Sequence, residues 1–316
     1  MSPLPAPPLR PTQLPPGGNT AGYWYDPNLT DERHHEFHGG WAHALPHETV
    51  LSVDYTHILG HDGWRQVDVN PIINGSRILA PQFQSVLGDK NILSNVYIIR
   101  SVDRSLYDEV TAHFERRFSP RASLQANYTL AWARGMGGVT DGTVITSAPY
   151  AQMPSATGGD INAPWETGPT AFDERHRVVV TGLLAIPGGI DVSPSMTFAT
   201  ARPYTQFRAV NPSGNGSLMI LDASGNPAGV NNARGIPLFN LNMRVTKNLP
   251  IGGERKVSLF AEFYNITNRA NFGNVFFGNA FAPATYGLPA GYLGGVGAVS
   301  TLPNSFQVQF GGRFTF

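Results

Sequence analysis

Residues 305–316 read SFQVQFGGRFTF, and this stretch decides the fold of the chain. Its even positions are apolar or glycine, and its odd positions are polar or glycine. Successive side chains of a β-strand point to opposite faces, so the stretch predicts a strand with one apolar and one polar face. Because an outer-membrane β-barrel offers lipid to one face and a wet lumen to the other, the pattern predicts a transmembrane barrel strand.

The apolar face of this strand carries the residues that we expect to contact lipid and to support membrane insertion. They are Phe306, Val308, Phe310, Phe314 and Phe316. A soluble sheet would seldom leave two aromatic side chains exposed at its last residues. The competing interpretation is an edge strand of a soluble sandwich whose apolar face packs on a core.

The composition bounds the class of protein. Of the 316 residues, 14% are charged, compared with about 25% in an average soluble protein. Lysine and arginine together balance aspartate and glutamate at 22 each, which gives no reason to expect a nucleic-acid partner. The sequence has no cysteine and no run of 18 apolar residues, so strands are the expected way to cross a membrane.

Eight further segments repeat the alternation and give nine predicted strands in total. We place them near residues 33–45, 49–59, 105–118, 121–135, 175–186, 190–202, 238–249, 255–267 and 304–316. Several reach the roughly nine to eleven residues that a tilted strand needs to cross a bilayer. Phe260 interrupts the polar face of its strand. A tenth strand near 92–102, paired with part of 60–80, would raise the count.

The connections between these strands alternate in length. The short connections contain Pro46, Pro120, Pro187 and Pro250, and the long ones cover 60–104, 136–174, 203–237 and 268–303. Short periplasmic turns and long extracellular loops are typical of outer-membrane barrels. The sequence therefore predicts an all-β fold: a partial, antiparallel, up-and-down transmembrane β-barrel of about nine or ten strands. We expect a proline-rich irregular segment at 1–30, without a signal peptide, and the barrel portion at 31–316.

Three groups of motifs indicate a family. The first is SLY at 105–107 with FERRF at 114–118 and ANYTL at 126–130. The second is FDERHR at 172–177 followed by Pro187 and Gly188, and the third is FYNITN at 263–268 with NFG at 271–273. In this order they resemble the C-terminal part of the TonB-dependent receptors, most closely the Oar-like members that bear a carboxypeptidase-type regulatory domain.

The resemblance implies an outer-membrane receptor that takes up a large nutrient through a plugged barrel of 22 strands. This chain would supply part of the lumen wall and extracellular loops. The implied partners are outer-membrane lipid, the barrel-assembly machinery, whose recognition signal the terminal strand resembles, and, in an intact relative, the TonB energy-coupling protein and an unidentified nutrient. The energy-coupling box, the plug and the early strands are absent from the sequence, so we expect a truncated gene product.

Two clusters of polar residues are candidates for chemistry. His34, Glu36 and His38 share one face of a strand and could bind Zn²⁺ or Cu²⁺, although a wet lumen face also explains them. Asp173, Arg175, His176 and Arg177 stand at a strand entry, where we expect a charge cluster at the extracellular rim rather than an acid–base site. We assign no catalytic, cofactor-binding or metal-binding residue and expect no enzyme and no cofactor, since no nucleophile elbow, phosphate loop or dinucleotide motif is present.

Two other functions remain open at this point. The first is a small self-contained outer-membrane barrel, a porin or an adhesin, closed by the tenth strand or by oligomerisation. The second is a secreted β-sandwich that binds carbohydrate, which predicts solubility without detergent.

Overall fold

The structure is a computed structural model of the whole chain. It describes residues 20–70, 72–73, 76–77, 79, 93–136, 167–206, 229–253, 255–273, 275–278, 282–293, 299–300 and 303–316. In these ranges the regular secondary structure consists of strands. None of the described segments forms a helix of the length and apolarity that crossing a membrane requires.

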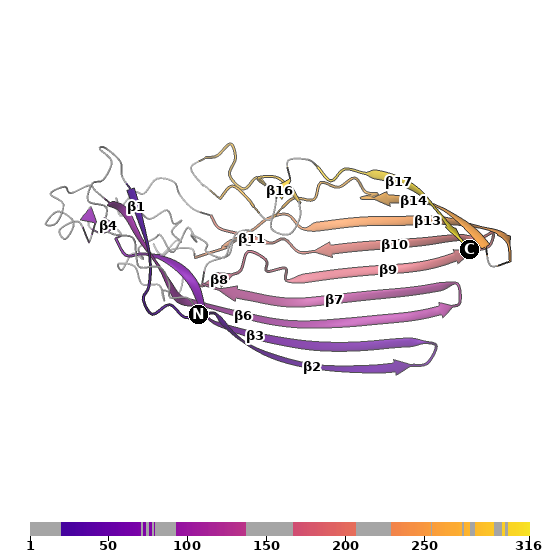
Figure 1. Ribbon diagram of the computed structural model, residues 1–316, viewed down its shortest axis with the longest axis horizontal. Coiled ribbons are helices and arrows are strands. Elements are labelled where there is room, and N and C mark those ends of the chain that lie inside the picture. Colours follow the sequence, from indigo (N-terminus) through magenta and orange to yellow (C-terminus); the bar gives the residue numbers. More distant parts are fainter. Residues whose placement is uncertain are drawn as a thin grey trace.

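Nine long strands form one antiparallel sheet (Figure 1). They are β2 (Arg33–Leu45), β3 (Thr49–Asp68), β6 (Leu93–Ser119), β7 (Ala122–Gly135), β9 (His176–Ile186), β10 (Ile190–Ala199), β13 (Leu238–Gly252), β14 (Arg255–Tyr264) and β17 (Gln307–Thr315). Their order across the sheet is β17-β14-β13-β10-β9-β7-β6-β3-β2, so neighbours in sequence are neighbours in space. The predicted up-and-down arrangement is confirmed.

Eight short strands complete the secondary structure of the described residues. β1 (Thr20–Tyr25) pairs with β6, and β8 (Gly168–Pro169) pairs with β7. The other six form three separate two-stranded sheets: β4 (Ile72–Ile73) with β5 (Ser76–Arg77), β11 (Pro203–Tyr204) with β12 (Ala233–Arg234), and β15 (Tyr292–Leu293) with β16 (Val299–Ser300). Except for β1, which precedes β2, they lie within the connections that the sequence predicts to be long.

The two ends of the sheet differ in their connections. Tight turns join β2 to β3, β6 to β7, β9 to β10 and β13 to β14 at the end where the C-terminus also lies (Figure 1). We call this end the turn rim, and we call the opposite end, which carries the long connections, the loop rim. The predicted alternation of short and long connections is therefore confirmed.

The pairing register keeps apolar residues on one face of the sheet, which we call the apolar face. One row across six strands consists of Ala122, Leu184, Val192, Val245, Ala261 and Phe310. Several members are open: Leu184 is 48% exposed and Phe310 is 78% exposed. A contiguous apolar surface of this kind is unfavourable in water and suits a bilayer.

Phe260 is one of several apolar residues on the opposite, polar face, where Val179 and Leu183 of β9 also lie, and the structure gives the reason for its position. Its partner across the β14–β17 ladder is Gly311, where a Cβ atom would collide with the Phe260 ring. The guanidinium carbon of Arg244 lies 3.8 Å from the centre of the same ring. The ring therefore covers a glycine and supports a cation on the polar face.

The predicted tenth strand is wrong as a separate element. Residues 93–102 are the first part of β6, which runs without interruption from Leu93 to Ser119. Residues 97–101 of this part pair with residues 64–68 of β3, so the predicted partner region was right and the predicted loop at 60–104 was too long. The two strands continue their ladder beyond the rest of the sheet, past a register shift between Gly60 and Trp64. We call this part, residues 63–68 and 97–103, the hairpin extension.

The N-terminal region also differs from the expectation. Residues 20–25, within the segment predicted to be irregular, form β1, which pairs in parallel with β6 at residues 93–99. Residues 1–19 lie outside the described residues.

The edges of the sheet are β2 and β17. In the described part of the chain, β2 pairs with β3 alone and β17 with β14 alone. Both edge strands run toward the turn rim, because an even number of antiparallel steps separates them. The soluble-sandwich interpretation is wrong, since the long strands form a single sheet whose apolar face carries exposed side chains such as Phe37, Leu184 and Phe310.

Candidate functional site

Charged side chains gather at the loop rim, where β7, the residues before β9 and the connection from β10 to β13 meet. Asp173 stands in the short irregular stretch that leads into β9, and its main-chain nitrogen bonds to the Thr170 oxygen at 3.0 Å. This local turn fixes the carboxylate beside the end of β7. The result is an acidic group held at the junction of three segments.

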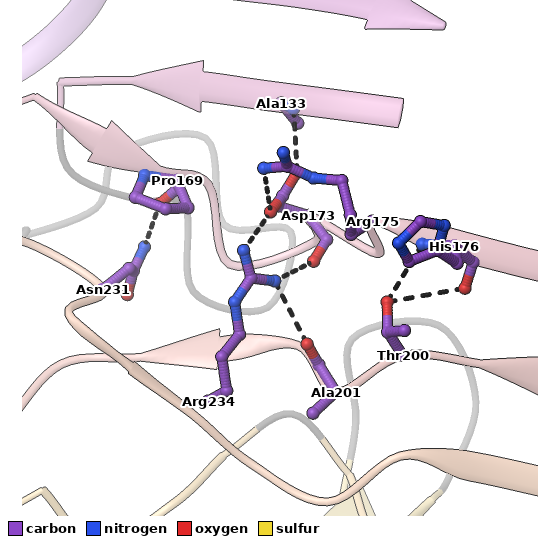
Figure 2. Close-up of polar contacts among 9 residues, drawn as sticks. All are labelled: Ala133, Pro169, Asp173, Arg175, His176, Thr200, Ala201, Asn231 and Arg234. Carbon is purple, nitrogen blue, oxygen red and sulfur yellow. Dashed lines mark hydrogen bonds and ion pairs between the residues drawn. The ribbon is translucent and has the colours of Figure 1, made fainter. Parts of the chain in front are cut away.

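Asp173 is the centre of this site, and its side chain is fully buried, with 0% exposed. The main-chain nitrogen of Ala133 on β7 donates to Oδ1 at 2.9 Å (Figure 2). Arg234, from β12, donates to Oδ2, and it also donates to the Asp173 main-chain oxygen at 2.7 Å. Arg175 approaches Oδ2 at 3.5 Å. We call the contacts of Asp173 with Ala133, Arg175 and Arg234 the rim clasp.

A second set of ion pairs lies beside the rim clasp. Glu174 accepts from Arg177 at 2.8 Å and from Arg202 at 2.7 Å. The two arginines come from β9 and from the residues after β10. Together with the rim clasp, these pairs tie the entry of β9 to the connection between β10 and β13.

His176 takes a different orientation. The main-chain nitrogen of His176 donates to the Thr200 hydroxyl oxygen at 3.0 Å (Figure 2). In the same view, His176 has no drawn contact with the Asp173 carboxylate. Its ring stacks on Tyr128, and Nδ1 lies 2.8 Å from the Tyr128 hydroxyl oxygen. Through the register of β7 and β9, Tyr128 shares the apolar face with Val178. The ring of His176 is therefore separate from the ion pairs.

The structure thus divides the predicted charge cluster. Asp173 and Arg175 contact each other, Arg177 pairs with Glu174, and His176 contacts Tyr128. The sequence interpretation missed Arg234, which stands 61 residues from Asp173. No local pattern links residues so far apart, whereas Glu174 lies inside the FDERHR motif and could have been included.

This arrangement suits structural support better than chemistry. Both carboxylate oxygens of Asp173 accept hydrogen bonds from groups that hold them in place. Arg175 also lies over the Trp132 ring, with its guanidinium carbon 4.9 Å from the ring centre. A general base needs an oxygen that can reach a substrate proton, and both oxygens of Asp173 are already committed to protein donors.

The histidine-rich strand β2 holds the other candidate residues. His34, Glu36 and His38 lie on one face, and the nearest polar partners of the histidines are Glu32 at 3.2 Å from His34 and Thr56 at 3.2 Å from His38. Among the residues that the structure describes, no group of three or more histidine, aspartate or glutamate side chains is placed to hold a metal ion.

The residues predicted to contact lipid lie in or beside β17. Val308, Phe310 and Phe314 share the apolar face with Phe263, Ala261 and Val257 of β14. Phe306 stacks on Phe263, and Phe316 stacks on Phe314. All five predicted side chains are exposed, and Phe316 is the most open of them.

Solved structures resemble this fold. The outer membrane transporter YddB from Escherichia coli superposes with a TM-score of 0.53 at 10% identity, covering 77% of this chain and 30% of the transporter. The ferric enterobactin receptor PfeA (G324V) from Pseudomonas aeruginosa gives 0.49 at 11% identity, with 89% and 30% covered. The siderophore receptor PiuA from Acinetobacter baumannii gives 0.40 at 10% identity, with 76% and 25% covered. At 10% identity the likeness to YddB shows the fold alone, and the chain spans less than a third of the length of each of the three structures.

No sequence among curated proteins matches the chain. The family of outer membrane beta barrel domains matches residues 1–193, which is more than half of the chain. The open apolar face and the transporter-like sheet agree with this match, and the protein is one of the outer membrane. The chain therefore belongs to the outer membrane beta-barrel domain family.

Proposed function

We propose that this chain forms part of the wall and extracellular rim of a TonB-dependent receptor of the Oar-like kind, which takes up a large nutrient. The observation that carries the proposal is the polarity of the sheet. Every tight turn between long strands lies at the rim of Phe316, the long connections lie at the other, and one face is predominantly apolar between the two rims. The motifs in residues 105–316 support the Oar-like assignment.

The spacing of charged groups on the apolar face supports a membrane-spanning role. On β6, Asp108 and Arg116 lie on this face, and the three outward residues between them are Val110, Ala112 and Phe114. At about 3.4 Å per residue the two charged residues lie roughly 27 Å apart along the strand. Because barrel strands are tilted, the distance between the two residues along the membrane normal is shorter and approaches the height of the apolar band of a barrel. Tyr55 and His57 hydrogen-bond Asp108, each at 2.7 Å, as expected for a charge at the headgroup level.

The directions of the edge strands argue against a barrel that closes on itself. Because β2 and β17 both run toward the turn rim, joining them directly would create a parallel pair. The other long strands pair antiparallel throughout. A wall segment flanked by further strands avoids this mismatch, so the porin and adhesin alternatives rank below the receptor.

The same proposal assigns the partners. Phe306, Val308, Phe310, Phe314 and Phe316 contact lipid, and the terminal strand is the segment that the barrel-assembly machinery recognises. In an intact receptor, the TonB energy-coupling protein drives uptake from the inner membrane. The polar face lines the path of the nutrient, and the rim clasp holds the extracellular connections that surround its entrance.

Uptake by the source bacterium tests the proposal. We would delete the gene that encodes the chain, restore it in full, and measure accumulation of labelled ferric siderophore, cobalamin and maltodextrin with and without a protonophore. The proposal expects one of these solutes to show protonophore-sensitive uptake that disappears on deletion and returns on restoration. Deletion that reduces only passive entry of small solutes would favour a porin and contradict the receptor.

A pair of variants in neighbouring residues tests the assigned faces. Phe310→Arg places a cation on the apolar face and should cost about 2–4 kcal/mol near the bilayer centre, so the variant should fail to accumulate in outer membranes. Gln309→Arg places the same cation on the polar face and should accumulate normally. Immunoblots of membrane fractions would measure both, and equal accumulation of the two variants would refute the assignment.

A further inference from the structure

A cavity with basic walls lies on the apolar face of the sheet at the loop rim. It has a volume of about 360 Å³ and stands where the ends of β3, β6 and β7 meet. Three basic side chains contribute to its lining, His61, Arg104 and Arg134, and all three are exposed. A ligand can therefore reach them from outside the sheet. We call this cavity the basic cleft.

The floor of the basic cleft is apolar and continues the surface that faces lipid. Leu59 of β3 pairs with Leu106 of β6, and Leu106 pairs with Arg134 of β7, so the three side chains form one row on the apolar face. Leu106 lies two residues beyond Asp108 toward the loop rim, which is about 7 Å along the strand. With Asp108 at the headgroup level, the cleft lies within the headgroup layer, which extends roughly 5–7 Å on each side of the hydrocarbon core.

The two arginines of the cleft differ from other arginines of the same rim in their partners. Arg33 pairs with Asp62 at 2.6 Å, and Arg175 belongs to the rim clasp. Within the described part of the chain, no carboxylate forms an ion pair with Arg104 or Arg134. Two cations that line one cleft repel each other, and an anion bound between them would replace this repulsion by attraction on both sides.

The combination of basic walls and an apolar floor defines the class of ligand. Guanidinium groups bind phosphate oxygens through two parallel hydrogen bonds, which makes arginine well suited to a phosphate. A free phosphate would use only the basic walls, whereas a phosphorylated lipid also places its carbon chains on the leucine floor. Basic pockets at a membrane surface bind anionic headgroups for this reason. The volume is at the small end of ligand pockets, which suits a headgroup rather than a whole lipid.

We propose that the basic cleft binds the phosphorylated headgroup of a lipid of the outer leaflet. Arg104 and Arg134 hold the phosphate, and Leu59 and Leu106 contact the adjoining carbon chains. The proposal goes beyond the proposed function and rests on it only in placing the loop rim at the outer surface of the membrane. Lipid binding itself requires no transport.

Binding of lipid to the purified full chain in detergent micelles tests this proposal. The probes are a disaccharide lipid with two phosphates, the same lipid after removal of both phosphates, and inorganic phosphate as a competitor. Native mass spectrometry measures the fraction of the chain that carries lipid. The phosphorylated lipid should bind at least tenfold more tightly than the dephosphorylated one. Arg104→Gln and Arg134→Gln should each weaken its binding about tenfold, the low end for a hydrogen bond between charged groups, because both side chains are exposed.

Two variants control for charge alone. Arg116 lies on the same face of β6 at the turn rim and outside the cleft, so Arg116→Gln should leave the affinity for the lipid unchanged. Arg134→Lys keeps the charge without the two parallel hydrogen bonds, and its affinity should lie between those of Arg134→Gln and the unmodified chain. Equal weakening by Arg116→Gln and Arg134→Gln would show that any outward arginine attracts the lipid, and it would overturn the site.

Other outcomes would also overturn the proposal. Equal binding of the dephosphorylated lipid would show that the arginines do not select the phosphate, and displacement of the lipid by an equal concentration of inorganic phosphate would show that the carbon chains add nothing. The ligand-free melting temperature of each glutamine variant should match that of the unmodified chain, and a clear drop would assign the arginines a structural role instead. Energy-dependent uptake without lipid binding would reject the cleft and leave the proposed function standing, whereas lipid binding without uptake would leave the cleft standing.

Discussion

The two rims of the sheet are held together by different kinds of contact. At the turn rim the short connections contain contacts of their own: the Thr49 hydroxyl donates to the His47 oxygen at 3.2 Å, and the Arg121 nitrogen donates to the Ser119 hydroxyl oxygen at 3.1 Å. At the loop rim, Asp173 and Arg234 meet across 61 residues of chain. The turn rim therefore follows from local geometry, whereas the loop rim depends on a few buried long-range contacts.

The largest expected effect comes from removing the centre of the rim clasp. Asp173→Ala leaves Arg234 and the Ala133 nitrogen without their acceptor, and it should lower the free energy of unfolding by about 2–3 kcal/mol. This is below the cost of breaking a fully buried pair, because Arg234 remains 37% exposed. Urea unfolding of the chain in detergent micelles, followed by tryptophan fluorescence, would measure the change.

The matched control removes a carboxylate at the turn rim. Glu48 pairs with Arg117 at 3.7 Å, with the two side chains 70% and 58% exposed. Water screens such a pair, so Glu48→Ala should change the free energy of unfolding by less than about 0.5 kcal/mol. Equal losses of unfolding free energy in the two variants would show that the buried contacts of Asp173 at the loop rim stabilise the chain no more than the exposed pair at the turn rim.

The same contrast decides how much of the molecule the sequence predicts. Alternation is a local property of a strand, so residues 305–316 predict β17, its two faces and the rim at which it ends. The sequence predicts the pairing of the hairpin extension but treats it as a separate strand, because Gly60 and Gly63 interrupt the alternation at a register shift. The ladder nevertheless continues beyond it.

The sites at the loop rim are predictable only in part. The FDERHR motif identifies Asp173 and Arg175, but Arg234 comes from a distant connection and has no pattern of its own. The cavity at the loop rim that Asn240, Asn265 and Asn271 line shows the same limit. Its motif residues Asn265 and Asn271 are visible in the sequence, whereas Asn240 stands on another strand and meets them only after the sheet has formed.

A smaller effect tests the local geometry of the turn rim. Gly188 and Gly189 both have positive φ angles, 93° and 73°, which other residues adopt at a cost. A Cβ atom at Gly189 would lie 2.7 Å from the Asn248 oxygen, whereas at Gly188 it would meet open space. Gly189→Ala should therefore cost about 2 kcal/mol and Gly188→Ala about 1 kcal/mol. Urea unfolding of the two single variants checks the order, and the reverse order would contradict the turn geometry.

The smallest expected effect is a pH dependence confined to the loop rim. Asp103 lies in the hairpin extension, beyond the membrane-spanning part of β6, opposite Gly63. Burial raises the pKa of its carboxyl from 3.8 to about 6, against the charge of Arg65 and a 2.8 Å bond from the Arg104 nitrogen. The negative charge of Glu32 adds to the rise in pKa.

The sign of the effect follows from linkage. Because the folded pKa exceeds the unfolded value, the folded extension binds the proton more tightly. The resulting stabilisation is complete below about pH 4 and is lost as the pH rises through about 6. Hydrogen exchange of the amides in 97–103, corrected for intrinsic rates, should show less protection at pH 7.5 than at pH 5. Asp103→Asn should remove this dependence, while amides of the β9–β10 turn should show none. Protection that increases with pH in 97–103 would mean that the charged carboxylate is the form that stabilises the extension.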